Sequence, residues 1–244
     1  MKIINYISPN FDKKKRLKSA IRIIVIHYTG MQSERASLMR LCNPKSKVSS
    51  HFLINEKGLI LRLVKDQQIA WHAGKSYWGK YKNLNKNSIG IEMVNKGHKL
   101  EYKNFKKKQI LSLIKICKIL IKKYKIDKKN IVGHSDIAPL RKIDPGEKFP
   151  WKRLADNNIG VWHNLKSSFL KKYRNKKILE KKEKIKFIKN LRKIGYRFSD
   201  KKKPIFIKTL NAFQRHFRQE LINNLVDKEC SIIAHNLAKN YKKT

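Results

Sequence analysis

Residues 21–28 are Ile-Arg-Ile-Ile-Val-Ile-His-Tyr, an almost continuous run of β-branched apolar side chains that contains a histidine near its end. Such a run is typical of a central strand buried on both faces, in a sheet that helices cover on each side. His27 then stands at the carboxyl end of the strand. Because ligands of open α/β sheets bind outside the carboxyl ends of the strands, we expect His27 to belong to a functional site.

Two further apolar runs also carry a polar residue near their ends. Residues 88–95, Ser-Ile-Gly-Ile-Glu-Met-Val-Asn, predict a strand whose apolar residues share one face and whose Glu92 lies on the other. Residues 130–133, Asn-Ile-Val-Gly, predict a short strand followed directly by His134. If these strands are neighbours of the first one, His27, Glu92 and His134 converge on one edge of the sheet.

The pattern around these strands predicts an α/β domain. Apolar residues recur at helical spacing through 105–125, and residues 33–41 predict a shorter helix. A β-hairpin is predicted for 51–64. A long polar and aromatic loop follows it and contains residues 71–74, Trp-His-Ala-Gly. Loops of this length in compact domains are usually functional. The segment 135–151, rich in Pro and Gly, predicts a structured loop.

The last third of the chain has a different pattern. Residues 166–184 are rich in Lys and predict a connector, whereas helical periodicity with a cap at Gly195 predicts three helices in 185–244. We therefore expect a first domain over residues 1–165, this connector, and a small three-helix domain.

The formal net charge of +43 suggests an acidic partner, because Lys and Arg release counterions when they meet phosphates. The charge is spread along the whole chain, however, which favours a solvated Lys-rich surface. No nucleic-acid motif is present, so nucleic acid is not an expected partner, although attraction to an acidic polymer such as bacterial cell wall stays open.

The three cysteines are far apart and odd in number, which favours a reducing compartment over a disulfide framework. The N-terminus lacks the apolar core and small-residue cleavage site of a signal peptide, and no lipobox cysteine is present. No run reaches the roughly 18 apolar residues of a membrane span. We expect a cytoplasmic monomer, with the cell envelope or periplasm as the alternative location.

Two imidazoles and a carboxylate are a ligand set for a catalytic Zn²⁺ that keeps its fourth position for water. Asp144 lies ten residues after His134, in Arg-Lys-Ile-Asp-Pro-Gly, and this restrained loop can fold back to complete the set. Each residue alone has a plainer interpretation, since Asp before Pro-Gly is often only a turn residue. Together they favour a metallohydrolase, because Glu92 would otherwise be a carboxylate without a partner in an apolar strand.

The same residues lie in blocks that resemble the zinc-dependent N-acetylmuramoyl-L-alanine amidases of the type-2 family, which are related to the peptidoglycan recognition proteins. The blocks occur in the family's order over residues 20–155: Val25-Ile26-His27-Tyr28-Thr29, Ser50-His51-Phe52-Leu53-Ile54, Trp71-His72-Ala73-Gly74, Ser88-Ile89-Gly90-Ile91-Glu92, Val132-Gly133-His134-Ser135-Asp136-Ile137-Ala138-Pro139 and Arg141-Lys142-Ile143-Asp144-Pro145-Gly146.

The resemblance implies a mixed central β-sheet flanked by helices, and one Zn²⁺ per chain held by His27, His134 and Asp144. It also implies that Glu92 and Lys142 are catalytic. Glu92 would move the proton of the attacking water to the departing amine, and Lys142 would stabilise the oxyanion. The bond cut would join the lactyl group of N-acetylmuramic or anhydro-N-acetylmuramic acid to L-alanine, in peptidoglycan or muropeptides during wall turnover and recycling.

Four residues are weaker candidates for substrate contacts. His51 is either a substrate contact or a core histidine, with equal support, and Arg62 is a candidate partner for a stem-peptide carboxylate. Trp71 and His72 lie in the functional loop and could line a peptide groove.

The C-terminal helices, with Ala-Phe-Gln-Arg-His-Phe-Arg at 212–218, resemble a small peptidoglycan-binding domain appended to some of these amidases. A non-catalytic receptor for wall fragments is the main alternative function. Such proteins lack one of the three metal ligands, whereas all three are present here. A nucleic-acid binder that uses the Lys-rich segments is a second alternative.

Overall fold

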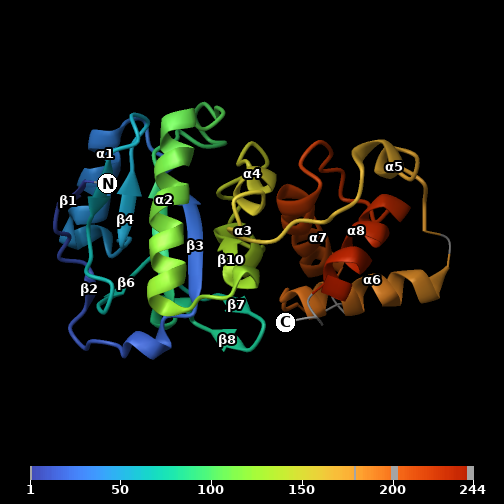
Figure 1. The fold of residues 1–244 in the computed structure, drawn as a ribbon, viewed down its shortest axis with the longest axis horizontal. Coiled ribbons are helices and arrows are strands. Elements are labelled where there is room, and N and C mark those ends of the chain that lie inside the picture. Colours follow the sequence, from blue (N-terminus) through green and yellow to red (C-terminus); the bar gives the residue numbers. More distant parts are fainter. Residues whose placement is uncertain (1, 179, 199–202, 241–244) are drawn as a thin grey trace.

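Six strands form a mixed central sheet in the order β1-β5-β4-β9-β3-β10 (Figure 1). The structure is a computed structural model that describes residues 2–178, 180–198 and 203–240. Strands β4, β9, β3 and β10 run parallel to one another, whereas β5 is antiparallel to β4 and β1 is parallel to β5. The bounds are β1 (Ile3–Asn5), β3 (Ile23–Tyr28), β4 (Phe52–Ile54), β5 (Ile60–Arg62), β9 (Ser88–Met93) and β10 (Ile131–Gly133).

Helix α2 (Lys107–Tyr124) covers one face of the sheet (Figure 1). Its apolar stripe packs on alternate strand residues such as Ile24 of β3 and Ile89 and Ile91 of β9, all fully buried. The predicted helix over 105–125 is therefore present. Because side chains alternate along a strand, the neighbours of these residues point to the opposite face, where the polar groups of β3 and β9 lie.

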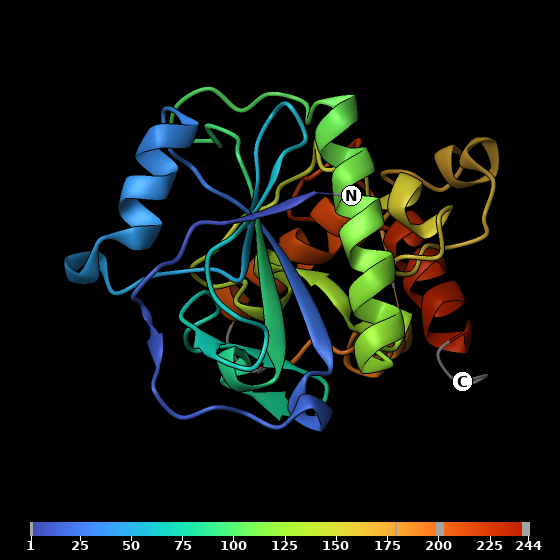
Figure 2. The same cartoon turned by 60° about the vertical axis from the view of Figure 1, so that its left-hand side comes forward.

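That opposite face is covered by two separate apolar clusters. Helix α1 (Glu34–Cys42) packs on Leu53 and Leu61 at the β4 and β5 side, so α1 and α2 lie on either side of the strands (Figure 2). At the β3 and β10 side, Val25 and Val132 share a core with the C-terminal helices. The polar groups of β9 lie between the two clusters.

Three helices form in the region predicted for them: α6 (Lys181–Ile194), α7 (Lys203–Phe217) and α8 (Lys228–Asn240). They lie at the β10 side of the sheet (Figure 1). Phe187 and Phe213 belong to the same apolar cluster as Val25 of the sheet. The three helices thus bury apolar surface jointly with the sheet.

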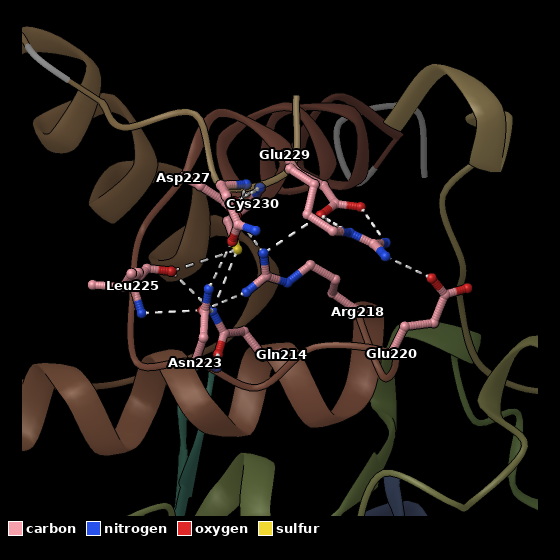
Figure 3. Close-up of polar contacts among 10 residues, drawn as sticks. Gln214, Arg218, Glu220, Asn223, Leu225, Asp227, Glu229 and Cys230 are labelled. Carbon is pink, nitrogen blue, oxygen red and sulfur yellow. Dashed lines mark hydrogen bonds and ion pairs between the residues drawn. The ribbon is translucent and has the colours of Figure 1, made fainter. Parts of the chain in front are cut away.

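A buried polar network joins these helices to the segment predicted as a connector. Arg218 at the end of α7 lies between Asp227 and Glu229 (Figure 3), with its Nη1 2.5 Å from Asp227 Oδ2 and 3.4 Å from Glu229 Oε2. Arg174 in turn donates two 2.8 Å hydrogen bonds to the Glu229 carboxylate. Buried charges are tolerated when they are paired in this way.

The remaining elements are short. They are β2 (Phe11–Asp12) paired with β6 (Ile69–Ala70), β7 (Tyr77–Trp78) paired with β8 (Tyr81–Lys82), α3 (His134–Ile137), α4 (Trp151–Ala155), α5 (Ser167–Lys171) and single 3₁₀ turns at Lys18–Ala20, Pro44–Ser46, Leu84–Lys86 and Lys128–Asn130. Within the described ranges, no helix has the length and apolarity that crossing a membrane requires.

Candidate metal centre

His27 and Glu92 lie side by side at the carboxyl ends of β3 and β9, where they are paired residues in the parallel ladder. Paired residues in neighbouring strands project from the same face of the sheet. Val25 with Gly90, and Ile23 with Ser88, are the preceding pairs on this face. The motif Ser-Ile-Gly-Ile-Glu therefore places its first, third and fifth residues in one row that leads to the site.

His134 begins the one-turn helix α3 directly after β10, so residues 135–137, which the sequence predicts as the start of a loop, are helical. The chain then returns to it: the Ser135 N–H donates a 2.8 Å hydrogen bond to the Asp144 carbonyl. Pro145 packs closely on Gly133, where an added Cβ would come within 2.7 Å of its ring. The loop therefore folds back as expected and brings Asp144 beside His134.

Three ligand atoms meet at this point. His27 Nδ1 lies 2.9 Å from His134 Nδ1 and 3.1 Å from Asp144 Oδ2, and His134 Nδ1 lies 3.2 Å from the same oxygen. All three side chains are buried. They form the one group of three or more His, Cys, Asp or Glu side chains in the described residues that is arranged to hold a metal ion.

The protonation states at this point suit a divalent cation. Burial, together with the neighbouring His134 imidazole, lowers the pKa of His27 to about 4, so its ring is neutral near pH 7. Burial opposes ionisation of Asp144, but the two imidazoles outweigh it and hold its pKa far below the ordinary value. Metal ligands must be neutral imidazoles and ionised carboxylates, and His₂Asp is a donor set that zinc accepts. The residues therefore fit the metal.

Glu92 is partly buried next to these ligands, and its Oε2 is buried with no hydrogen-bond partner among the described residues. Burial and the negative charge of Asp144 raise its pKa to about 8, while Lys142 acts in the opposite direction. A carboxyl group with a pKa near the working pH can both accept and donate a proton. Glu92 is thus suited to general acid and base chemistry.

A pocket of about 470 Å³ opens above the three ligand residues. Glu92 and Lys142 both line it, so the structure brings together all five residues predicted as ligands or catalysts. Its rim is strongly basic. The cationic side chains that line it are Arg40, Lys96, Lys99, Arg141 and Lys142.

Two of the four predicted substrate residues, Trp71 and His72, also line this pocket. The Trp71 indole N–H donates a 2.7 Å hydrogen bond to Asp12 Oδ1. His72 bonds through both ring nitrogens, at 3.1 Å to His27 Nε2 and at 3.1 Å to Ser88 Oγ. Burial and the neighbouring imidazoles of His27 and His51 hold the pKa of His72 well below its ordinary value.

The structure does not bring His51 and Arg62 to the pocket. His51 is fully buried, and its ring contacts Arg16, the Gln68 carbonyl and the Gly90 N–H, which matches the core-histidine alternative. Arg62 is paired with Phe52, which is in turn paired with Ile91, so Arg62 projects from the face of the sheet that α2 covers and pairs with Asp66 at 3.3 Å. Glu92 and the site lie on the other face, because side chains alternate along each strand.

Several residues of the pocket were not identified from the sequence. Arg40, Lys96 and Lys99 line it together with Tyr28 and His98. The lysines have no distinguishing signal in a chain with 60 Lys and Arg residues. Tyr28 was recoverable, because it follows His27 at the end of the same strand.

Comparisons with known proteins agree with this geometry. A sequence model described as N-acetylmuramoyl-L-alanine amidase matches residues 17–147. The chain is 35% identical to N-acetylmuramoyl-L-alanine amidase AmiD of Escherichia coli, over 94% of this chain and 88% of AmiD. It is also 35% identical to 1,6-anhydro-N-acetylmuramyl-L-alanine amidase AmpD of Haemophilus influenzae, over 62% of this chain and 89% of AmpD.

Solved structures give the same result. The complex of E. coli AmiD with anhydro-N-acetylmuramic acid-L-Ala-D-γ-Glu-L-Lys matches with a TM-score of 0.81 and 34% identity, over 96% of this chain and 93% of that one. AmpDh3 of Pseudomonas aeruginosa, in complex with an anhydromuramic pentapeptide, matches with a TM-score of 0.80 and 31% identity, over 94% of each chain. The likeness therefore includes the C-terminal helices as well as the sheet.

Proposed function

The chain belongs to the N-acetylmuramoyl-L-alanine amidase family, and from this premise we propose that one Zn²⁺, held by His27, His134 and Asp144, serves its hydrolysis of the amide bond between the muramic lactyl group and L-alanine. The observation that carries the proposal is the meeting of the three ligand atoms, 2.9 to 3.2 Å apart, in a pocket that also contains Glu92.

The pocket contains residues for each role in the hydrolysis: metal ligands, a general acid and base, and a cation to stabilise the oxyanion. Zinc held by His27, His134 and Asp144 would lower the pKa of a bound water and polarise the scissile carbonyl. Glu92, with its raised pKa, accepts the proton of the attacking water and passes it to the departing amine of L-alanine. Lys142 lines the same pocket, where its ammonium group would stabilise the negative charge that develops on the carbonyl oxygen in the transition state.

The basic rim supports a muropeptide substrate. Five cationic side chains face a pocket whose acidic members are Glu92 and Asp144, so the pocket attracts anionic groups. The stem peptide of a muropeptide carries several carboxylates. We therefore expect peptidoglycan fragments with a free stem peptide, including anhydro-muropeptides, to be substrates, with turnover and recycling of cell wall as the role.

Incubation of the purified protein with an anhydro-muramyl tripeptide, followed by mass analysis, tests the proposal. We expect release of a peptide that begins with L-alanine, loss of release with a chelator, and recovery with Zn²⁺. The Glu92→Gln variant should bind zinc but release no peptide, and Glu56→Gln, at an exposed residue of the turn between β4 and β5, should behave like the wild type. Binding of the muropeptide without release by the zinc-loaded protein would instead indicate a wall-fragment receptor.

A further inference from the structure

A chain of hydrogen bonds runs from the backbone of the Leu84 turn to the metal centre. The Ser88 hydroxyl lies 2.6 Å from the Leu84 carbonyl oxygen and 3.1 Å from His72 Nε2. His72 Nδ1 lies 3.1 Å from His27 Nε2. The other nitrogen of His27, Nδ1, is the one that meets His134 and Asp144.

The direction of every hydrogen bond in this chain follows from the Leu84 carbonyl oxygen, which is its first acceptor. A carbonyl oxygen can only accept, so the single proton of the Ser88 hydroxyl is used toward Leu84. The hydroxyl oxygen then accepts from His72 Nε2–H. A neutral imidazole has one N–H, so His72 Nδ1 carries a lone pair and accepts from His27 Nε2–H. This leaves the lone pair of His27 on Nδ1.

We propose that His72 and Ser88 are positioning residues, which hold the proton of His27 on Nε2 and thereby direct its Nδ1 lone pair to the metal. The inference deepens the proposed zinc site and rests on it. Hydrogen bonds to the outer nitrogen of a histidine ligand commonly set its tautomer and ring orientation. Here the fixed point is a backbone carbonyl two side chains away from the ligand.

The surrounding structure is shaped to hold this arrangement. Gly90 leaves room for the imidazole of His72, because an added Cβ would come within 2.5 Å of that ring. The Asn85 side chain accepts hydrogen bonds from the backbone N–H groups of His72 and Ala73, at 3.2 and 2.7 Å. Ring position and backbone position are thus both restrained.

The two proposed histidine ligands differ in the hydrogen-bond partner of the outer ring nitrogen, Nε2. His134 Nε2 is buried and has no hydrogen-bond partner among the described residues, whereas His27 Nε2 has His72. Both nitrogens of His72 are already engaged, so it has no hydrogen bond to offer a substrate. Its place on the pocket wall is therefore that of a support for His27.

Substitution of Ser88 tests the proposal with little change in shape. Ser88→Ala removes the acceptor of His72, and Ser76→Ala is the matched control. Ser76 is a fully buried serine whose hydroxyl donates to the Gly74 carbonyl at 2.9 Å and accepts from Leu84 N–H at 3.1 Å, so it supports the same turn without itself linking Ser88, His72 or His27. We expect Ser88→Ala to weaken zinc binding about 10-fold to 100-fold in competition with a chelating dye. Ser76→Ala should leave zinc affinity unchanged.

The tautomer of His27 is measured directly by ¹⁵N NMR of the metal-free protein. We expect the proton on Nε2 in the wild type and in Ser76→Ala, and a mixture of tautomers in Ser88→Ala and in His72→Leu. His72→Gln, which keeps an amide oxygen to accept from His27, should retain more zinc affinity than His72→Leu. Thermal unfolding of each variant shows that it is folded.

A proton on Nδ1 of His27 in the wild type, or equal zinc affinity of Ser88→Ala and Ser76→Ala, would overturn the proposal. The test is separable from that of the proposed function. If the protein releases no peptide but the proton lies on Nε2 and shifts in Ser88→Ala, the positioning role stands and the proposed function fails.

Discussion

The Tyr196 hydroxyl donates a 2.6 Å hydrogen bond to Oδ1 of Asp136, two residues after the proposed ligand His134. The other oxygen of Asp136 accepts from the Gly133 N–H and bonds His216 Nδ1, each at 2.7 Å. Tyr196 and His216 belong to the C-terminal helical region, whereas Gly133 is the last residue of β10. Through these hydrogen bonds Asp136 links the C-terminal helical region to the turn that carries the proposed ligand His134.

Tyr196→Phe should destabilise the protein and weaken zinc binding together. The substitution leaves a buried carboxylate oxygen without this partner, which costs about 1–3 kcal/mol. Urea unfolding and chelator competition measure the two effects, with Tyr173→Phe, a partly exposed tyrosine, as the size-matched control. If zinc affinity is unchanged while stability falls, the Tyr196–Asp136 hydrogen bond stabilises the fold but does not position the metal ligand.

Asp144→Asn should abolish tight zinc binding. The amide keeps the shape of the side chain but lacks the negative charge that the two neutral imidazoles cannot supply. We expect the dialysed variant to contain almost no zinc and to release no peptide. Asp156→Asn, at the exposed end of α4, should retain a full equivalent of zinc. Full zinc content in Asp144→Asn would remove Asp144 from the ligand set.

Glu92→Gln should stabilise the metal-free protein at alkaline pH. The folded state raises the pKa of Glu92 from 4.5 to about 8, so its contribution to stability is complete below about pH 4.5 and is lost as the pH rises to about 8. At pH 8 we expect the variant to exceed the wild type by about 1–3 kcal/mol in unfolding free energy, because it removes a buried charge. At pH 4.5 the two proteins should be nearly equal.

Urea unfolding of chelator-treated protein at the two pH values gives this comparison, and Glu56→Gln serves as the exposed control. A difference between Glu92→Gln and wild type that does not grow with pH would mean that Glu92 ionises normally in the folded state.

Lys142→Gln should lower kcat about 100-fold to 1000-fold at unchanged zinc content, as for loss of one group that stabilises an oxyanion. It should also move the acid limb of kcat/KM to higher pH, because the charge of Lys142 lowers the pKa of Glu92. Lys80→Gln, at an exposed residue of the turn between β7 and β8, should change neither. A lower kcat with an unmoved acid limb would separate Lys142 from Glu92.

Arg218→Met should cost about 3–5 kcal/mol of stability, because it leaves Asp227 as a buried carboxylate without its cation and removes one of the two arginines that pair with Glu229. Arg174→Met should cost less, since that side chain is partly exposed and its position near the surface weakens the pairing. Equal losses in urea unfolding would contradict the difference in burial.

Local patterns were enough to predict the strands that carry the site. The apolar runs before His27 and His134 and the alternation around Glu92 are short-range signals, and they located three of the five central residues. The position of Arg62 depended on the register of β5 with β4, which places it on the face that α2 covers and which no local pattern contains. The role of His72 depended on which face of β9 it meets, since its partners Ser88 and His27 are distant in sequence.

The packing of the C-terminal helices against the sheet could not be predicted from the sequence either. A three-helix unit needs apolar residues such as Phe187 and Phe213 for its own core, so the same residues give no sign that they also meet Val25 of the sheet. Asp136 was visible only as part of a motif. Its partners Tyr196 and His216 lie 60 and 80 residues further along the chain.

The alternation along β9 has a consequence for folding fidelity. A slip of one position in strand pairing exchanges the two faces of a strand. In β9 such a slip would turn Ile89, Ile91 and Met93 away from α2. It would place Ser88, Gly90 and Glu92 in the apolar core beneath that helix. A chain with this misaligned strand would lose the apolar packing beneath α2 together with the correct position of Glu92. The register that buries the apolar residues of β9 is therefore the same register that places Glu92 at the site, so correct folding and a correctly placed catalyst occur together.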